Sequence, residues 1–236
     1  MTAARAGAAA RPGGTLLLFA PGAGAPSTST WMTAWRERLA ALGRVVTLDY
    51  PYMRQGRRTP DRLPALIAAH RQALAASRAE GEAAFLIGKS MGGRIGCHVA
   101  VEEAAGGGAG VRGVIALGYP LRAASSGALR DQVLLALRTP ILFVQGTRDE
   151  LCDLDELAAV RARMTAPSAL HVVDGGDHSL ELTARQRKAT GDTQEASDAR
   201  VLAAIAAFIA APGAAPSGAP GPGVSGPGTA SSPSAA

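Results

Sequence analysis

The chain has 236 residues, of which 47% are hydrophobic, and its formal net charge is +5. This length and apolar content favour a globular domain with its own core, while two cysteines are too few for a disulfide scaffold. No apolar run approaches the roughly 20 residues needed to cross a bilayer, so we expect no membrane partner.

The positive charge is weak evidence for nucleic-acid binding, because the arginines are dispersed along the chain. We therefore expect no nucleic-acid partner. Cys97 and Cys152 are expected to be reduced thiols, which suits a cytoplasmic protein.

The two ends of the chain differ in composition from the middle. Residues 1–13 consist mainly of Ala, Gly and Arg without periodicity, and we predict a flexible leader that is not a signal peptide. Residues 212–236 contain only Pro, Gly, Ala, Ser, Val and Thr, which cannot offset their ordering entropy by burial. We predict a disordered tail there and one folded domain over residues 14–211.

Short apolar runs alternate with helix-length segments along this domain. The predicted strands are Thr15–Ala20, Arg44–Asp49, Ala83–Gly88, Val111–Gly118, Pro140–Gly146 and Leu170–Asp174. The predicted helices are Ser29–Leu42, Leu63–Arg78, Met91–Ala104, Gly127–Leu137, Asp153–Met164 and Glu195–Ala210. Most strands are continuously apolar, as in parallel sheets buried on both faces. The pattern predicts an α/β fold with a doubly wound, mostly parallel sheet and a functional site beyond the strands' carboxyl ends.

A G-x-S-x-G pattern joins the third predicted strand to the helix that follows, as Gly88-Lys89-Ser90-Met91-Gly92. A sharp turn between strand and helix would expose Ser90, whose hydroxyl becomes a nucleophile only when a base takes its proton. The Met91 N–H would point to where negative charge develops. The alternative is a glycine-rich connection with a capping serine. The phosphate-loop and dinucleotide-loop patterns do not fit this turn.

An acid and a histidine follow the last two predicted strands. Asp149 and His178 come after Ser90 in the chain order typical of serine hydrolases built on such a sheet. His178 would act as the base and Asp149 would orient its imidazole. Asp149 could instead cap the helix near Asp153, and His178 could be an ordinary loop residue. Glu150 and Asp153 remain alternative acids.

These residues resemble the α/β-hydrolase superfamily over about residues 14–211. More narrowly, the chain resembles the dienelactone-hydrolase-like bacterial members related to the hydrolase-like domain of a subunit of the eukaryotic non-specific lethal complex, a chromatin complex. The resemblance lies in Phe19–Gly24, Asp49–Tyr52, Gly88–Arg94, Gly146–Asp149 and Gly176–His178. It implies hydrolysis of an ester, thioester, amide or related acyl bond without a cofactor. We expect no metal site, because neither H-x-x-x-H nor C-x-x-C occurs in the sequence.

The resemblance also implies an oxyanion hole. The Ala23 N–H would join the Met91 N–H, with Gly24 as the alternative donor to Ala23. Pro21 stands where many relatives have histidine. Since a backbone N–H is the donor, this departure need not abolish activity.

Several residues near these motifs are candidates for a substrate pocket, namely Gly24, Lys89, Tyr52 and Arg54. Only Tyr119–Thr139 separates two predicted strands where many relatives carry a large lid, so we expect a minimal lid and an open site. Arginines 54, 57, 58 and 62 could steer an anionic substrate, or could form a solvated loop with Asp61. Trp31 and Trp35 could line an acyl pocket or belong to the core.

The leading hypothesis is a serine hydrolase that acts on a small acyl substrate through an acyl-enzyme on Ser90. The alternative is a non-catalytic interaction module that retains the fold. The oligomeric state does not follow from the sequence.

Overall fold

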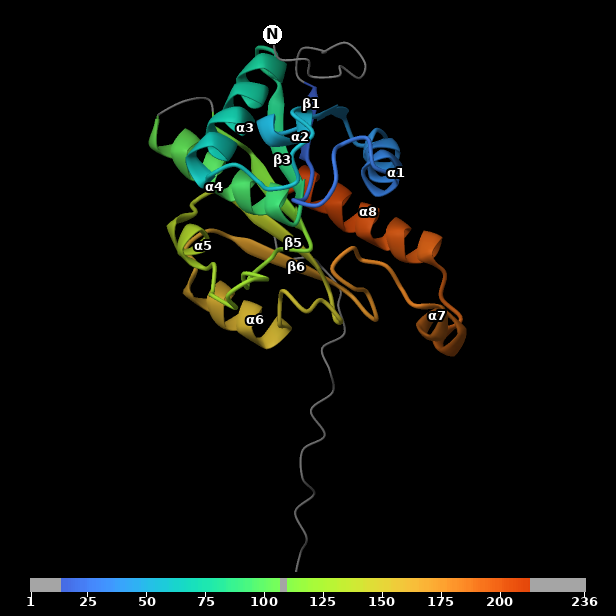
Figure 1. Cartoon of the computed structure of the whole chain (residues 1–236). Helices are drawn as coiled ribbons and strands as arrows, with labels where there is room; N and C mark the ends of the chain where they lie inside the picture. Colours follow the sequence, from blue (N-terminus) through green and yellow to red (C-terminus); the bar gives the residue numbers. More distant parts are fainter. Residues whose placement is uncertain (1–13, 107–109, 213–236) are drawn as a thin grey trace, which may run out of the picture.

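Six parallel strands form one sheet in this computed structural model, which describes residues 14–106 and 110–212 (Figure 1). The strands are β1 (Thr15–Ala20), β2 (Arg44–Thr47), β3 (Ala83–Lys89), β4 (Gly113–Leu117), β5 (Ile141–Gly146) and β6 (Ser168–Val173). Their order across the sheet is β2-β1-β3-β4-β5-β6. The predicted parallel α/β sheet is therefore confirmed. The predicted leader and residues 213–236 of the predicted tail lie outside the described residues.

The apolar runs form strands because both faces of the sheet are covered. Along β1, Leu16 and Leu18 point into one core, whereas Leu17 and Phe19 point into the other, and all four are fully buried. Successive side chains of a strand point to opposite faces, so a strand between two cores must be apolar at every position.

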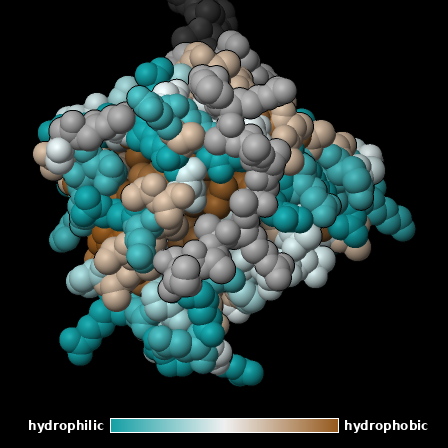
Figure 2. Space-filling view, turned by 90° about the horizontal axis from the view of Figure 1, so that it is seen from above, coloured by the Kyte–Doolittle hydropathy of each residue, from teal (hydrophilic) through white to brown (hydrophobic). Residues whose placement is uncertain are grey.

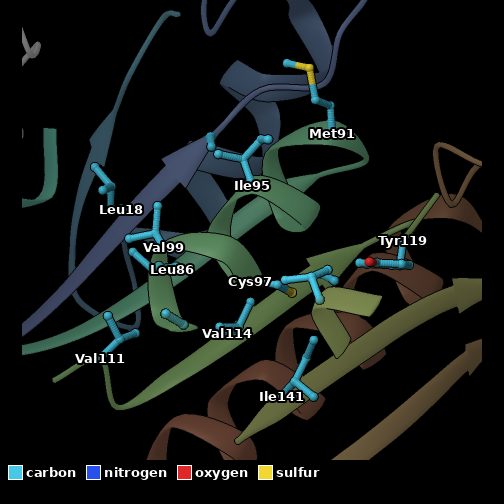
Figure 3. Close-up of a cluster of buried hydrophobic side chains, with 14 of the residues drawn as sticks. Leu18, Leu86, Met91, Ile95, Cys97, Val99, Val111, Val114, Tyr119 and Ile141 are labelled. Carbon is cyan, nitrogen blue, oxygen red and sulfur yellow. The ribbon is translucent and has the colours of Figure 1, made fainter. Parts of the chain in front are cut away.

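The helices lie in two layers. α3 (Leu63–Ser77), α4 (Met91–Ala105), α5 (Gln132–Ala136) and α6 (Leu154–Arg163) contribute buried residues to one core. α1 (Thr30–Leu39) and α8 (Gln194–Ala210) contribute to the other. Figure 3 shows the first core, where Ile95 and Val99 of α4 lie beside strand residues such as Leu18 and Leu86.

The predicted helix over Gly127–Leu137 is wrong in its first half, because α5 covers only Gln132–Ala136. Gly127 adopts a φ of +65°, and its carbonyl oxygen accepts a hydrogen bond from Arg122 at 2.7 Å. Leu129 forms an isolated antiparallel bridge with Arg122. These contacts hold residues 127–131 in an irregular, non-helical conformation. The stretch nevertheless carries no large inserted lid.

Two short helices had no counterpart among the predicted elements. α2 (Pro51–Arg54) begins at a proline, whose fixed φ suits the first turn of a helix. α7 (Ala184–Thr190) follows the N-cap Thr183 and buries no residue, so it lacks the apolar stripe by which helices are recognised in a sequence.

Seen from above, hydrophilic side chains dominate the rim of the molecule and apolar ones gather nearer the middle (Figure 2). Of the helices in residues 14–106 and 110–212, none has the length and apolar character to cross a membrane.

Candidate active site

The candidate site lies where the order of the strands changes direction. From β1 the chain moves outward to β2, then returns to add β3 on the other side of β1. The loops that follow β1 and β3 therefore diverge and leave a crevice between them, as expected in a doubly wound sheet. A Cβ atom on Gly22, after β1, would lie 3.5 Å from the Ser90 Cβ, after β3.

Ser90 occupies a strained turn between β3 and α4. Its φ of 49° and ψ of −117° are rarely adopted by residues with a side chain. The turn closes only because its neighbours are glycines: a Cβ on Gly88 would lie 2.1 Å from the Gly93 nitrogen. A Cβ on Gly92 would lie 2.5 Å from the Ala20 carbonyl oxygen. The strain lifts the hydroxyl clear of the sheet.

The structure brings Ser90, His178 and Asp149 together as one hydrogen-bonded chain. His178 Nε2 lies 2.8 Å from Ser90 Oγ, and His178 Nδ1 lies 2.8 Å from Asp149 Oδ2. Asp149 is 6% exposed, whereas the His178 side chain is 28% exposed. A buried acid, a partly exposed imidazole and a raised hydroxyl in this order form the geometry of a nucleophile with its base.

Two further donors hold the Asp149 carboxylate. The Leu151 N–H donates to Oδ1 at 2.9 Å, and the Gln145 side-chain amide donates to Oδ2, the oxygen that faces His178. Gln145 is fully buried, and its own Oε1 accepts from the Tyr119 N–H at 2.9 Å. Gln145 is not among the site residues that the sequence predicts. Its only signal was a polar residue near the end of the otherwise apolar β5.

The loop that carries His178 is packed tightly against the ends of the strands. Gly118 has a φ of +66°, and a Cβ there would lie 2.5 Å from the His178 carbonyl oxygen. Asp177 Oδ1 accepts from the backbone N–H groups of Ser179 and Glu181, at 2.7 Å and 3.0 Å. The His178 imidazole therefore projects from a turn that is held by close packing on Gly118 and by the hydrogen bonds to Asp177.

The loop after β1 is tied down through Tyr52. The Tyr52 hydroxyl donates to the Ala23 carbonyl oxygen at 2.9 Å. Burial, followed by the carboxylates of Asp61 and Asp49, raises the pKa of Tyr52 to about 12, so the hydroxyl keeps the proton that it donates. Met91 is the first residue of α4, where a backbone N–H has no acceptor within the helix.

A cavity of about 530 Å³ opens beside Ser90 and His178. Its lining comes from residues 22–25, Ser29–Met32, Lys89 and Ser179. Trp31 forms part of this wall, whereas Trp35, one helical turn later, is 2% exposed and belongs to the core. Of the two roles that the sequence allows, Trp31 therefore has that of a pocket wall and Trp35 that of a core residue.

The candidate pocket residues fall in different places. Gly24 and Lys89 line the cavity beside Ser90. Tyr52 lines a second cavity of about 520 Å³, which shares residues 23–25 with the first. Arg54 lies on the exposed surface, where it donates to the Asp49 carbonyl oxygen at 3.0 Å, and it is not among the lining residues of either cavity.

The alternative acids and the arginine loop also have definite positions. Glu150 is exposed, and Asp153 caps α6 by accepting from two backbone N–H groups. Arg57 pairs with Asp61 at 2.5 Å and, together with Arg58, lines the second cavity. The loop is therefore partly neutralised by its own acid and also borders the site.

No three His, Cys, Asp or Glu side chains gather into a metal-binding group within residues 14–106 and 110–212. His70 is fully buried in α3, and its Nδ1 lies 3.2 Å from the Tyr50 hydroxyl. Burial lowers the pKa of His70 to about 3, so the ring stays neutral inside the core.

Comparison with known proteins agrees with this architecture. Residues 13–210 match the family described as an alpha/beta hydrolase domain. Among solved structures, Est1E from Butyrivibrio proteoclasticus with bound ferulic acid is 17% identical, with a TM-score of 0.57 over 81% of this chain and 90% of that one. Dienelactone hydrolase from Anabaena variabilis is 18% identical, with a TM-score of 0.57 over 83% and 86%.

A third structure, an alpha-beta serine hydrolase homologue from Coxiella burnetii, is 19% identical, with a TM-score of 0.55 over 70% of this chain and 76% of that one. At these identities the likeness concerns the fold. The narrower resemblance to relatives of a chromatin-complex subunit stays a prediction.

Proposed function

This chain belongs to the α/β-hydrolase domain family, and we propose that it is a serine hydrolase that cleaves an ester, thioester or related acyl bond of a small substrate. The observation that carries the proposal is the position of His178, whose two ring nitrogens each lie 2.8 Å from a partner, Ser90 Oγ on one side and Asp149 Oδ2 on the other. An imidazole held between an acid and a hydroxyl can take a proton from the hydroxyl and later return it.

In the first half of the reaction, Ser90 Oγ attacks the acyl carbon while its proton passes to His178 Nε2. Asp149 stabilises the imidazolium that forms. The backbone N–H groups of Met91 and of Ala23 or Gly24 would donate to the developing oxyanion. Collapse of this intermediate breaks the bond to the leaving alcohol or thiol, which takes the proton from His178 and leaves an acyl group on Ser90.

In the second half, a water molecule attacks the acyl-enzyme and gives its proton to the same nitrogen. The acid product leaves and Ser90 recovers its proton, so the cycle consumes one water and needs no cofactor. The partly exposed imidazole and the small insertion between β4 and β5 leave a path for that water.

The cavity beside Ser90 suits the acyl part of the substrate. Its walls include Trp31, Met32 and the small residues 22–25. A cavity of about 530 Å³ with largely apolar walls favours an uncharged acyl group of modest size.

A fluorophosphonate probe, which modifies an activated serine without needing the natural acyl group, tests this proposal. We expect the full chain to be labelled and the Ser90→Ala variant to remain unlabelled. Ser29→Ala is the matched control, because it removes a hydroxyl from the wall of the same cavity and should leave labelling unchanged. An unlabelled full chain would favour the non-catalytic interaction module.

A further inference from the structure

Lys89 precedes Ser90 in the chain, and its side chain reaches the loop that carries His178, the histidine loop. Its Nζ donates hydrogen bonds to the His178 carbonyl oxygen at 3.1 Å and to Ser179 Oγ at 2.9 Å. The same ammonium lies over the Trp31 ring, 4.7 Å from its centroid, within the range of a cation–π interaction.

Trp31 completes the arrangement from the side of α1. Its indole Nε1–H donates to the Ser179 carbonyl oxygen at 2.8 Å. Ser179 is thus held at its hydroxyl by Lys89 and at its carbonyl by Trp31. We call Lys89, Trp31 and Ser179 the histidine clasp, because Lys89 and Trp31 both hydrogen-bond to Ser179, the residue that follows His178.

The position of the Lys89 ammonium is unusual for a lysine. Lysine side chains normally extend their charged head into water. Here burial lowers the pKa of Lys89, while the nearby carboxylates of Asp177 and Asp149 act in the opposite direction. A charge drawn away from water needs oxygen partners, and the two acceptors on the histidine loop supply them.

We propose that Lys89 is a positioning residue, which acts through the histidine clasp to keep the His178 imidazole in line with Ser90 and Asp149. The inference rests on the proposed function. The imidazole must meet two partners at 2.8 Å at once, so a small displacement of its loop breaks the proton path. A misplacement of about 1 Å in such a site lowers the rate on the order of 100-fold.

The histidine clasp also connects the wall of the acyl pocket to the loop that carries the base, His178. Trp31 and Lys89 both line the cavity beside Ser90. The residues that would contact the acyl group are therefore the ones that hold the histidine loop.

The test compares Lys89→Met with Lys89→Arg in the full chain, with a nitrophenyl acetate as substrate. Methionine keeps the length and the packing on Trp31 but donates no hydrogen bond. We expect kcat to fall about 10- to 100-fold while KM changes by less than about twofold, since the short acetyl group needs little of the pocket. Lys89→Arg, which keeps N–H donors and the charge, should recover most of the lost kcat.

Lys188→Met is the matched control, because Lys188 is the other lysine of the chain and lies exposed on α7. It should leave kcat unchanged. Ser179→Ala should add less to the loss in the Lys89→Met background than it causes alone, because both changes break the same hydrogen bond.

An unchanged kcat in Lys89→Met, or a loss that Lys89→Arg does not reduce, overturns the inference. If Lys89→Met does not fold, Lys89→Leu, which also donates no hydrogen bond, carries the same comparison. The two proposals fail separately: an unlabelled wild-type protein in the fluorophosphonate assay refutes the hydrolase function. A labelled wild type with an equally fast Lys89→Met refutes the histidine clasp alone.

Discussion

Replacing Asp149 by asparagine should disable the site, because asparagine keeps the size of the side chain but has only one acceptor oxygen. The two carboxylate oxygens of Asp149 accept from three donors: Leu151 N–H on Oδ1, and both Gln145 and His178 on Oδ2. An amide has one oxygen to accept with, and its nitrogen only donates. The asparagine nitrogen must therefore take the place of either Oδ1 or Oδ2, where it faces a hydrogen-bond donor instead of offering an acceptor.

The structure indicates which partner gives way. The Leu151 N–H belongs to the backbone and cannot change its role. Gln145 cannot turn its amide over, because its Oε1 already accepts from the Tyr119 N–H. His178 is the one partner that can become an acceptor, so its own contact adjusts while the Gln145 N–H is left without an acceptor. His178 would move its proton to Nε2, leaving Nδ1 as an acceptor, and could then no longer take the proton of Ser90.

A histidine trapped in the wrong tautomer lowers turnover by on the order of 10⁴-fold, or about 5.4 kcal/mol of transition-state stabilisation. We expect Asp149→Asn to lose that much kcat on a nitrophenyl acetate, while the melting temperature falls by only a few degrees, because one buried donor is left without an acceptor. Asp153→Asn is the matched control: asparagine is a good N-cap, so α6 and activity should both persist. Retention of more than about a tenth of the activity by Asp149→Asn, or an equal loss in Glu150→Gln, would show that the acid is misassigned.

Three other predictions concern the frame around the site. Gly92→Ala places a Cβ 2.5 Å from the Ala20 carbonyl oxygen and should lower both the melting temperature and kcat; an unchanged melting temperature would contradict the steric argument. Burial alone would raise the pKa of Glu82, but hydrogen bonds from Arg44 and the Ala79 amide hold it below its usual range. The Arg44–Glu82 ion pair therefore stabilises the fold above a pH of about 4.5, and this stabilisation is lost as the pH falls through the lower pKa that Glu82 has in the folded state. Glu82→Gln should cost about 3 kcal/mol at pH 7 in urea unfolding, and a gap to the wild type that stays constant down to pH 3 would refute the pairing. Deleting residues 213–236 should leave the melting temperature unchanged in calorimetry, since the composition offers little to bury, and a loss of several degrees would show that the segment packs on the domain.

The sequence by itself determined the sheet, because strands covered on both faces must be apolar at every position, as Leu16–Phe19 are. It also placed Ser90, Asp149 and His178 at a common edge, since parallel strands bring their carboxyl ends together. The local sequence pattern did not predict the conformation where contacts between residues far apart in the chain decide it. The irregular conformation of residues 127–131 depends on Arg122, whose side chain is itself held by Glu156, 34 residues further along. The helix α7 buries no residue, so it has no apolar stripe that a sequence pattern could detect.

Only the tertiary structure decided how the candidate site is held. Gln145 resembles any polar residue at the end of a strand until Asp149 and the Tyr119 N–H are seen on its two sides. Trp31 and Trp35 are equivalent in the helical pattern, and only the position of α1 makes one a cavity wall and the other core. The reach of Lys89 to His178 and Ser179, 89 and 90 residues further along the chain, is a matter of packing between loops. The periodicity of apolar residues indicates which face of a helix or strand is buried. It does not indicate which residues pack against that face.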